Sequence, residues 1–424
     1  MASQPVVHED RSPFDRLGAS GPEENAMKSY PSVAAVAFLA LAGAPALGAS
    51  LAGSLVAAAG ADGARAAPEA PRPKRPLVQI ALLLDTSGSM EGLIGQAKAQ
   101  LWKVVNELAT AKRDGAHPEL RIALYEYGNS GLAEKDHWIR QVSPFTDDLD
   151  RVSEQLFALT TNGGSEYCGA VIARALDELG WSTSPDDLKL VFIAGNEPFT
   201  QGPIDFRATV KRAAAKGISV NTIHCGSQAE GVATGWKDGA VLADGTFLVI
   251  DHDRVAADVP APQDAELARL NDALNATYIP YGAQGAAMQQ RQNAQDANAK
   301  KLSPSSVSTR ARSKASGLYK NAGWDLVDAA REGKVKVEAL DAGELPPEVR
   351  KLGPAERRAY VEQKGEQRAA LQRQIAAASQ ARAAFLAKEQ AKIAKAARGS
   401  TDTLDSAMIK AVRAQAKKRR YTFE

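Results

Sequence analysis

Oxygen-bearing side chains are concentrated between residues 85 and 89. Asp85, Ser87 and Ser89 stand two residues apart, directly after the apolar run 78–84 and shortly before an amphipathic segment that begins at Leu93. One carboxylate and two hydroxyls at this density suit a hard cation such as Mg²⁺, which prefers oxygen ligands and keeps several waters. The run therefore predicts a metal-binding loop between a strand and a helix. A helix cap without a metal is the alternative, because Asp and Ser are also favoured at helix N-termini.

Apolar runs alternate with amphipathic segments from residue 77 to residue 281. Most of the apolar runs are continuous, which is typical of strands that helices cover on both faces. The alternation predicts an α/β fold: a Rossmann-like, open and mainly parallel sheet with helices on both faces, which binds ligands at the carboxyl ends of its strands. Strands are predicted at 78–84, 121–127, 189–194, 219–224 and 246–250, with an edge strand at 137–142. Helices are predicted at 93–110, 149–159, 168–179, 206–216 and 265–274.

The loop and the order of elements together resemble a known family. Asp85-Thr86-Ser87-Gly88-Ser89 is similar to the Asp-x-Ser-x-Ser loop of the metal-ion-dependent adhesion site (MIDAS) of von Willebrand factor type A (vWA) domains, and residues 77–281 resemble that fold. The resemblance implies a bound divalent cation, Mg²⁺ before Mn²⁺ or Ca²⁺. In that family a second loop adds a Thr and a third strand end adds an Asp. The ligands implied here are Asp85, Ser87, Ser89, Ser165 and Asn196.

Two of the implied ligands depart from the family pattern. Ser165, in the run Asn162-Gly163-Gly164-Ser165, stands in place of the Thr and still offers a hydroxyl oxygen. Asn196 stands in place of the Asp and offers a neutral carbonyl, so the site loses one negative charge. Glu166 and Glu197 are adjacent to these two positions, and we regard them as auxiliary acidic candidates that restore the charge.

The resemblance implies divalent-cation-dependent protein binding, in which the open position of the cation captures an acidic side chain of a partner. We expect an adhesion or scaffold module and not an enzyme, because the sequence offers no obvious histidine as a general base beside the metal. Metal-assisted hydrolysis at the same open position is a less favoured class. The main alternative is a metal-independent scaffold whose basic C-terminal helices bind an anionic envelope component or a partner protein.

The beginning of the chain has the layout of an export signal. Residues 1–26 are polar, and we interpret them as a non-native or disordered extension. Met27-Lys28 is followed by an uncharged stretch at 29–61, so residues 27–66 are predicted to be a signal peptide or a signal anchor, before a Pro-rich linker at 67–76. The protein is then expected to be exported, either periplasmic or anchored in the membrane and facing the periplasm or the cell exterior.

The chain has two cysteines, Cys168 and Cys225, which are too few for a disulfide scaffold or a cysteine-based zinc site. Both are predicted near the carboxyl edge of the sheet. Outside the cytoplasm they could form one disulfide, which typically contributes about 2–4 kcal/mol of stability. Two buried free thiols that act as small apolar residues are the alternative.

The formal net charge of +2 is unevenly distributed along the chain. Residues 350–424 hold eighteen Lys and Arg against seven Asp and Glu. We predict no further strands beyond residue 282: the chain continues with a helical or irregular connecting region at 282–349 and basic helices in 350–424, with a coiled coil among the arrangements that the long helix allows. This charge favours an anionic envelope surface as a partner. Nucleic acid is not expected, because aromatic residues that could stack on bases are sparse there.

Overall fold

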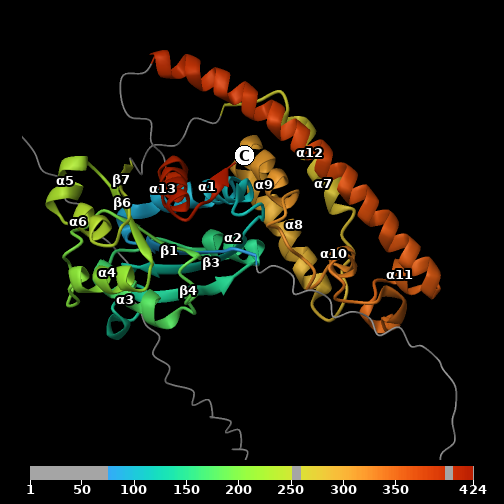
Figure 1. Cartoon of the computed structure of the whole chain (residues 1–424), viewed down its shortest axis with the longest axis horizontal. Coiled ribbons are helices and arrows are strands. Elements are labelled where there is room, and N and C mark those ends of the chain that lie inside the picture. Colours follow the sequence, from blue (N-terminus) through green and yellow to red (C-terminus); the bar gives the residue numbers. More distant parts are fainter. Residues whose placement is uncertain (1–74, 251–258, 397–403, 424) are drawn as a thin grey trace, which may run out of the picture. The chain divides into compact units, whose positions relative to one another are not determined.

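The computed structural model describes residues 75–250, 259–396 and 404–423, which belong to one compact unit of the chain (Figure 1). The predicted extension at 1–26, the leader at 27–66 and nearly all of the linker at 67–76 lie outside the described residues. Within the described residues, no helix combines the length and the apolar character that crossing a membrane requires.

Six strands form an open sheet with the order β4-β3-β1-β5-β6-β7. Neighbours pair in parallel, except that β4 runs antiparallel to β3 at one edge. The predicted α/β fold is confirmed. The edge strand starts two residues later than predicted, because His137 and Trp138 adopt left-handed backbone conformations with φ of 58° and 52°. The strands are β1 (Leu77–Asp85), β3 (Glu119–Tyr127), β4 (Ile139–Thr146), β5 (Leu188–Gly195), β6 (Ser219–Cys225) and β7 (Phe247–Ile250).

Side chains of successive residues in β1 lie on opposite faces of the sheet. Ile80, Leu82 and Leu84 belong to one buried core, and Ala81 and Leu83 belong to another. This is the period of two that a strand imposes on its side chains. Figure 1 shows α1 and α13 on one side of the sheet and α3 and α4 on the other. The helices are α1 (Glu91–Ala109), α2 (Leu149–Ala158) and α13 (Leu404–Lys418) on the first face, and α3 (Cys168–Glu178), α4 (Phe206–Ala215) and α6 (Trp236–Val241) on the second, with α5 (Gln228–Ala233) before α6.

The helices after the sheet pack against its first helical layer. Helix α9 contacts α1, α8 contacts α2, and α7 contacts both α9 and α12. The Gln-, Asn- and Ala-rich stretch of the connecting region is helix α8, and a small separate core forms around Leu326 and Val349. These helices are α7 (Asp264–Asn275), α8 (Gly285–Leu302), α9 (Pro304–Lys314), α10 (Leu326–Arg331), α11 (Pro347–Arg350) and α12 (Pro354–Ala396).

A buried charged cluster joins α2 to α8 and α9. The guanidinium of Arg310 on α9 donates to Asp150 on α2 at 2.7 Å and to Asp296 on α8, and the ammonium of Lys314 lies 2.9 Å from Asp296. Burial alone would raise the pKa of Asp296, but the charges of Arg310 and Lys314 outweigh it and hold that pKa well below its usual value. Opposite charges therefore compensate one another inside this interface.

Two arginines of α12 are buried rather than solvated. Arg368 donates to Asp325 and Asp328, at 2.5 and 2.9 Å, and Arg382 donates to Asp264 at 2.6 Å. The long basic helix is thus anchored by ion pairs, which its weakly periodic apolar residues did not indicate. In the described part of α12, packing is against α7, α9, α10 and a short 3-10 turn, and nothing in it supports a coiled coil.

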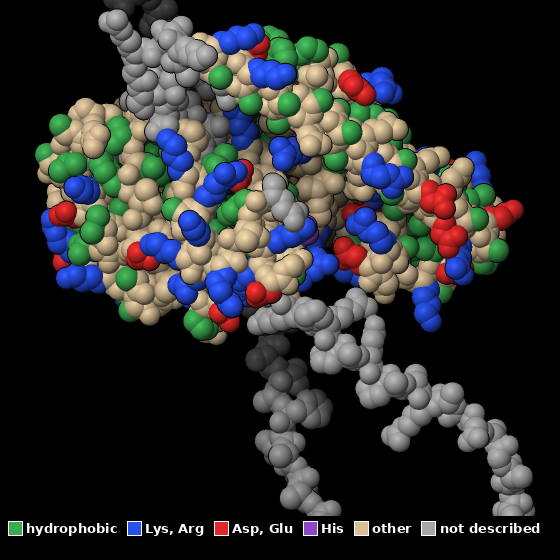
Figure 2. Space-filling view, turned by 45° about the horizontal axis from the view of Figure 1, so that its top comes forward, with side chains coloured by type: hydrophobic (Ala, Val, Ile, Leu, Met, Phe, Trp, Pro, Cys, Tyr) green, Lys and Arg blue, Asp and Glu red, His purple; other side chains and the backbone are tan. Residues whose placement is uncertain are grey.

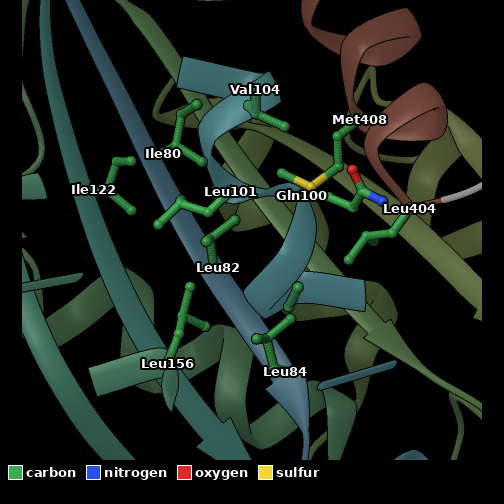
Figure 3. Close-up of a pocket in the computed structure, with 11 residues that line it drawn as sticks. Ile80, Leu82, Leu84, Gln100, Leu101, Val104, Ile122, Leu156, Leu404 and Met408 are labelled. Carbon is green, nitrogen blue, oxygen red and sulfur yellow. The ribbon is translucent and has the colours of Figure 1, made fainter. Parts of the chain in front are cut away.

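Helix α13 covers the sheet beside α1 and leaves a small cavity beneath it. Figure 3 shows side chains of β1, α1 and α13 around this space, which measures about 30 Å³ and is lined almost entirely by apolar residues. After α13, Thr422 and Phe423 form the short strand β8, which pairs antiparallel with β2 (Ala111–Lys112). The expectation of no further strands was therefore wrong, because a two-residue strand has no periodicity to detect.

Candidate metal-binding site

Three loops meet at the carboxyl edge of the sheet, as parallel strands β1 and β5 require. The loop after β1 lies against the loop before α3: the backbone N–H of Asn162 donates to the carbonyl of Thr86 at 3.0 Å. A Cβ on Gly88 would stand 3.5 Å from the backbone nitrogen of Gly163. The loop after β5 reaches the same place, since Asn196 Nδ2 donates to Ser89 Oγ at 3.3 Å. Residues that are far apart in sequence are therefore adjacent here.

Asp85 is the centre of this arrangement. It ends β1 and is fully buried, and its Oδ1 accepts a hydrogen bond from the backbone N–H of Ser87 at 2.7 Å. Its Oδ2 is buried and has no hydrogen-bond partner among the described residues. Burial raises the pKa of Asp85 to about 7, against the hydrogen bonds from Ser87 that lower it. A buried carboxylate with one unsatisfied oxygen is a group that a cation would stabilise.

The neighbouring polar groups are short and face one another. The hydroxyl oxygens of Ser87 and Ser89 are 3.3 Å apart, and Ser89 is exposed while Ser87 is buried. Asn196 Oδ1 is buried without a partner in the described part of the chain. Ser165 is half-buried, and no described hydrogen bond joins it to these groups. Its predicted role as a substitute for Thr stays a prediction.

Glu166 supplies a second buried carboxyl group to the site. Glu166 is 6% exposed, and its Cγ and Asp85 Oδ1 both lie against Gly128. Burial, followed by the negative charges of Asp85 and Glu197, raises the pKa of Glu166 to about 8. Of the two auxiliary candidates, Glu166 is thus deep in the site, whereas Glu197 is half-buried and acts on Asp85 through its charge.

Two glycines leave room for these carboxyl groups. A Cβ on Gly195 would stand 2.6 Å from the hydroxyl of Tyr127 and 2.9 Å from Asp85 Oδ2. Gly128, which has φ of +80°, would place a Cβ 2.6 Å from Glu166 Cγ and 2.9 Å from Asp85 Oδ1. Sequence reasoning missed both positions. The signal was present for Gly128 and Gly195 alike, because a glycine directly at the end of a buried strand often marks a close approach.

Sequence reasoning also missed the residues that hold the loop from behind. The hydroxyl of Thr86 donates to Glu126 Oε2 at 3.3 Å, and Glu126 is buried and paired with Arg140 on β4. Tyr127 donates its hydroxyl to the carbonyl of Ala194 at 3.0 Å, which ties the end of β3 to the end of β5. Such partners fix the backbone from which the ligand loop starts.

The donor set suits a hard cation. Carboxylate, hydroxyl and amide oxygens are ligands for Mg²⁺, Mn²⁺ or Ca²⁺ more than for softer metals. Among the described residues, no group of three or more His, Cys, Asp and Glu is placed to hold a metal ion by itself. Any cation here would therefore depend on the serine hydroxyls as well as on the carboxylates of Asp85 and Glu166.

A match to a known family covers the part of the chain that holds these three loops. Residues 79–232 match the von Willebrand factor type A domain. This VWA domain contains the loop after β1, the loop before α3 and the loop after β5, and it ends within α5. No curated protein matches the chain in sequence.

Several solved structures share part of the fold at low identity. Proximal thread matrix protein 1 from the mussel byssus is 12% identical with a TM-score of 0.32, and the match covers 42% of each chain, so it spans under half of that protein. BatB from Bacteroides thetaiotaomicron is 15% identical with a TM-score of 0.31, over 41% of this chain and 90% of that one. The vWF domain of the pilus tip protein Mfa5 from Porphyromonas gingivalis is 14% identical with a TM-score of 0.31, over 42% of this chain and 90% of that one.

Cys168 and Cys225, both in the VWA domain, are not joined by the disulfide that was predicted between them. Cys168 packs in the core on the α3 face of the sheet, whereas Cys225 packs in the core on the α1 face. The sheet lies between these cores. Burial raises the pKa of Cys168 far above its usual range, which is the behaviour of an inert apolar thiol.

Proposed function

We propose that the VWA domain binds a divalent cation at the carboxyl edge of its sheet, and that the cation captures an acidic side chain of a partner protein. Mg²⁺ is the first candidate, with Mn²⁺ and Ca²⁺ as alternatives. The observation that carries the proposal is the unsatisfied, buried Oδ2 of Asp85 among converging oxygen ligands. The residues that would hold the ion are Asp85, Ser87, Ser89 and Glu166, with Asn196, Ser165 or Glu197 completing the shell.

The charge of the site supports a divalent ion. In its ionised form, Glu166 compensates for the neutral Asn196, so that two buried carboxylates face one divalent ion. Burial raises the pKa of both Asp85 and Glu166. A bound cation would favour the ionised forms of these carboxyl groups again. Ser89, which is exposed, marks the side from which a partner carboxylate would reach the ion. We further propose a non-catalytic adhesion or scaffold role in the cell envelope, where an exported protein would meet such a partner.

Calorimetric titration of Mg²⁺, Mn²⁺ and Ca²⁺ into the full chain tests the metal. We expect saturable binding in the wild type and its loss in Asp85→Asn and in Ser89→Ala. Ser89 is exposed, so its substitution tests the ligand without disturbing the core. The control is Ser184→Ala, in the loop that leads into the amino end of β5, at the other end of the strands from the site. Equal affinity in the wild type and in both site variants would contradict the proposal.

The second candidate is a metal-independent scaffold that binds an anionic surface through its basic C-terminal residues. Lys417 and Arg420 favour it, because both are exposed and make no ion pair among the described residues. Against it, Arg413 is paired with Glu107 and Lys418 with Asp244. Figure 2 shows Lys and Arg side chains interspersed with Asp and Glu over one face of the molecule. Vesicles of anionic lipid that bind the wild type in EDTA, but not Lys417→Glu/Arg420→Glu, would support this candidate.

A further inference from the structure

Three aromatic side chains gather beside the candidate metal site. Tyr167, which directly follows Glu166, meets Trp138 edge-on with ring centroids 5.6 Å apart and meets His137 with centroids 5.9 Å apart. Tyr167 precedes α3, whereas His137 and Trp138 lie in the loop between β3 and β4. All three residues are half-buried, so the protein encloses none of them completely.

This aromatic surface, formed by His137, Trp138 and Tyr167, shares its supports with the metal site. The backbone N–H of Gly128 donates to the carbonyl of Trp138 at 3.1 Å, and Gly128 is the residue that makes room for Asp85 and Glu166. A Cβ on Gly202 would stand 2.6 Å from the ring of Tyr167, so the loop after β5 also closes on it. The aromatic surface and the metal site are therefore held by the same two loop regions, around Gly128 and after β5.

Two observations indicate that the surface is built for a contact. The indole N–H of Trp138, the hydroxyl of Tyr167 and the ring nitrogens of His137 make no hydrogen bond within the described chain, although other Trp N–H groups, such as that of Trp236, donate to a carbonyl. Trp138 also holds φ of 52°, which is costly for a bulky residue and is retained mainly where a site needs it. Tyr and Trp are enriched among residues that dominate interface energies.

The charges around the aromatic surface favour a cation. Glu134 and Asp136 are exposed just before His137, and Lys135 is the one basic residue between them. Two nearby arginines are already engaged: Arg174 with Glu178 and with the carbonyl of Ile139, and Arg140 with Glu126. Glu134 and Asp136 outnumber Lys135, and an aromatic surface beside a net negative charge attracts Arg or Lys to the faces of its rings.

We propose that His137, Trp138 and Tyr167 receive an Arg or Lys side chain of the same partner whose acidic group reaches the metal. This inference rests on the proposed function, because both contacts belong to one ligand. It names the partner more closely: a segment with an acidic residue for the ion and a basic residue a few positions away for the aromatic surface.

Selection of displayed random peptides on the full chain loaded with Mg²⁺ tests the inference. We expect selected peptides to share an acidic residue and an Arg or Lys at a fixed spacing, and to be released by EDTA. Peptides that share the acidic residue but no basic one would overturn the inference and leave the proposed function standing. Peptides that bind equally in EDTA and on Ser89→Ala would contradict the proposed function itself.

A double-mutant cycle on one selected peptide then locates the basic contact. Replacing its Arg by citrulline, which keeps the shape and removes the charge, should weaken binding to the wild type about tenfold and weaken binding to Trp138→Leu much less. The matched control is Trp181→Leu, which removes a half-buried tryptophan from the loop that leads into the amino end of β5. The inference fails if the citrulline peptide loses equal affinity on the wild type and on Trp138→Leu.

Discussion

Glu166 and Asp85 come from different elements, yet both lie against Gly128: a Cβ on that glycine would stand 2.6 Å from Glu166 Cγ and 2.9 Å from Asp85 Oδ1. Burial and the nearby charge of Asp85 together raise the pKa of Glu166. In the proposed metal site, Glu166 would supply a second acidic group from the loop before α3, whereas Asn196 on the loop after β5 is neutral.

Glu166→Gln should therefore weaken divalent cation binding by about tenfold or more, because it removes a charged group in contact with the ligand loop. Glu197→Gln should have a smaller effect, since Glu197 acts from the rim. Calorimetric titration measures both, with the exposed and distant Glu348→Gln as the control. Unchanged affinity in Glu166→Gln would show that the site does not use this carboxyl group.

Gly195→Ala should disrupt the site and destabilise the fold by about 1–3 kcal/mol, because the added methyl overlaps the hydroxyl of Tyr127 and Asp85 Oδ2. Chemical denaturation and cation titration give the two readouts. Gly163→Ala is the matched control in the same region, since a Cβ there meets nothing within 4 Å. Equal stability of the two variants would contradict the crowding around Asp85.

Arg310→Met should lower the free energy of unfolding by about 3–5 kcal/mol, because it leaves the buried carboxylate of Asp150 without its cation and Asp296 with Lys314 alone. Guanidinium denaturation of the full chain measures the loss. Arg207→Met removes an exposed pair with Asp238 and should cost about 1 kcal/mol or less. Similar losses in both variants would mean that the buried cluster does not hold the helical layer to the sheet.

The stability that Asp296 contributes should depend on pH in acid. Its folded pKa is held below the unfolded value of 3.8, so the unfolded carboxylate takes up its proton first as the pH falls. The contribution is then complete above about pH 5 and decreases as the pH falls through 3.8 toward the folded pKa. The difference in unfolding free energy between the wild type and Asp296→Asn, measured from pH 6 to pH 2, should shrink with falling pH. A constant or growing difference would reverse the assigned direction.

Val104→Ile should stabilise the protein by up to about 1 kcal/mol, because Val104 lines the cavity beneath α13 and one added methylene can enter it. Leu101→Ala at the same cavity should enlarge it and cost about 2–5 kcal/mol. Thermal and chemical denaturation compare both with Val232→Ile, at an exposed position. A destabilised Val104→Ile would indicate that the cavity cannot admit the extra group.

The sheet was predictable because its strands are continuous apolar runs, and a residue such as Leu82 can only be buried there. The position of Asp85 followed from the same pattern, since it directly ends such a run. The importance of Glu166 over Glu197 was not predictable, because both are adjacent to a matched position and only the loop path decides which one is buried. Arg310 and Arg368 were not predicted to be buried either, since burial of a charge depends on a partner from a distant part of the chain.

Helix α13 has a consequence for how the protein is made. Leu404 and Met408 share a core with Ile80 and Leu82, so the apolar face of the sheet is closed by a segment that is synthesised long after the strands. Until residues 404–418 have emerged, the part of that face that α13 covers stays exposed in a nascent chain, although α1 and α2 are already present on the same face. A fragment cut at the VWA boundary of 79–232 would lack this helix, so a fragment made to study the site should keep residues 404–418.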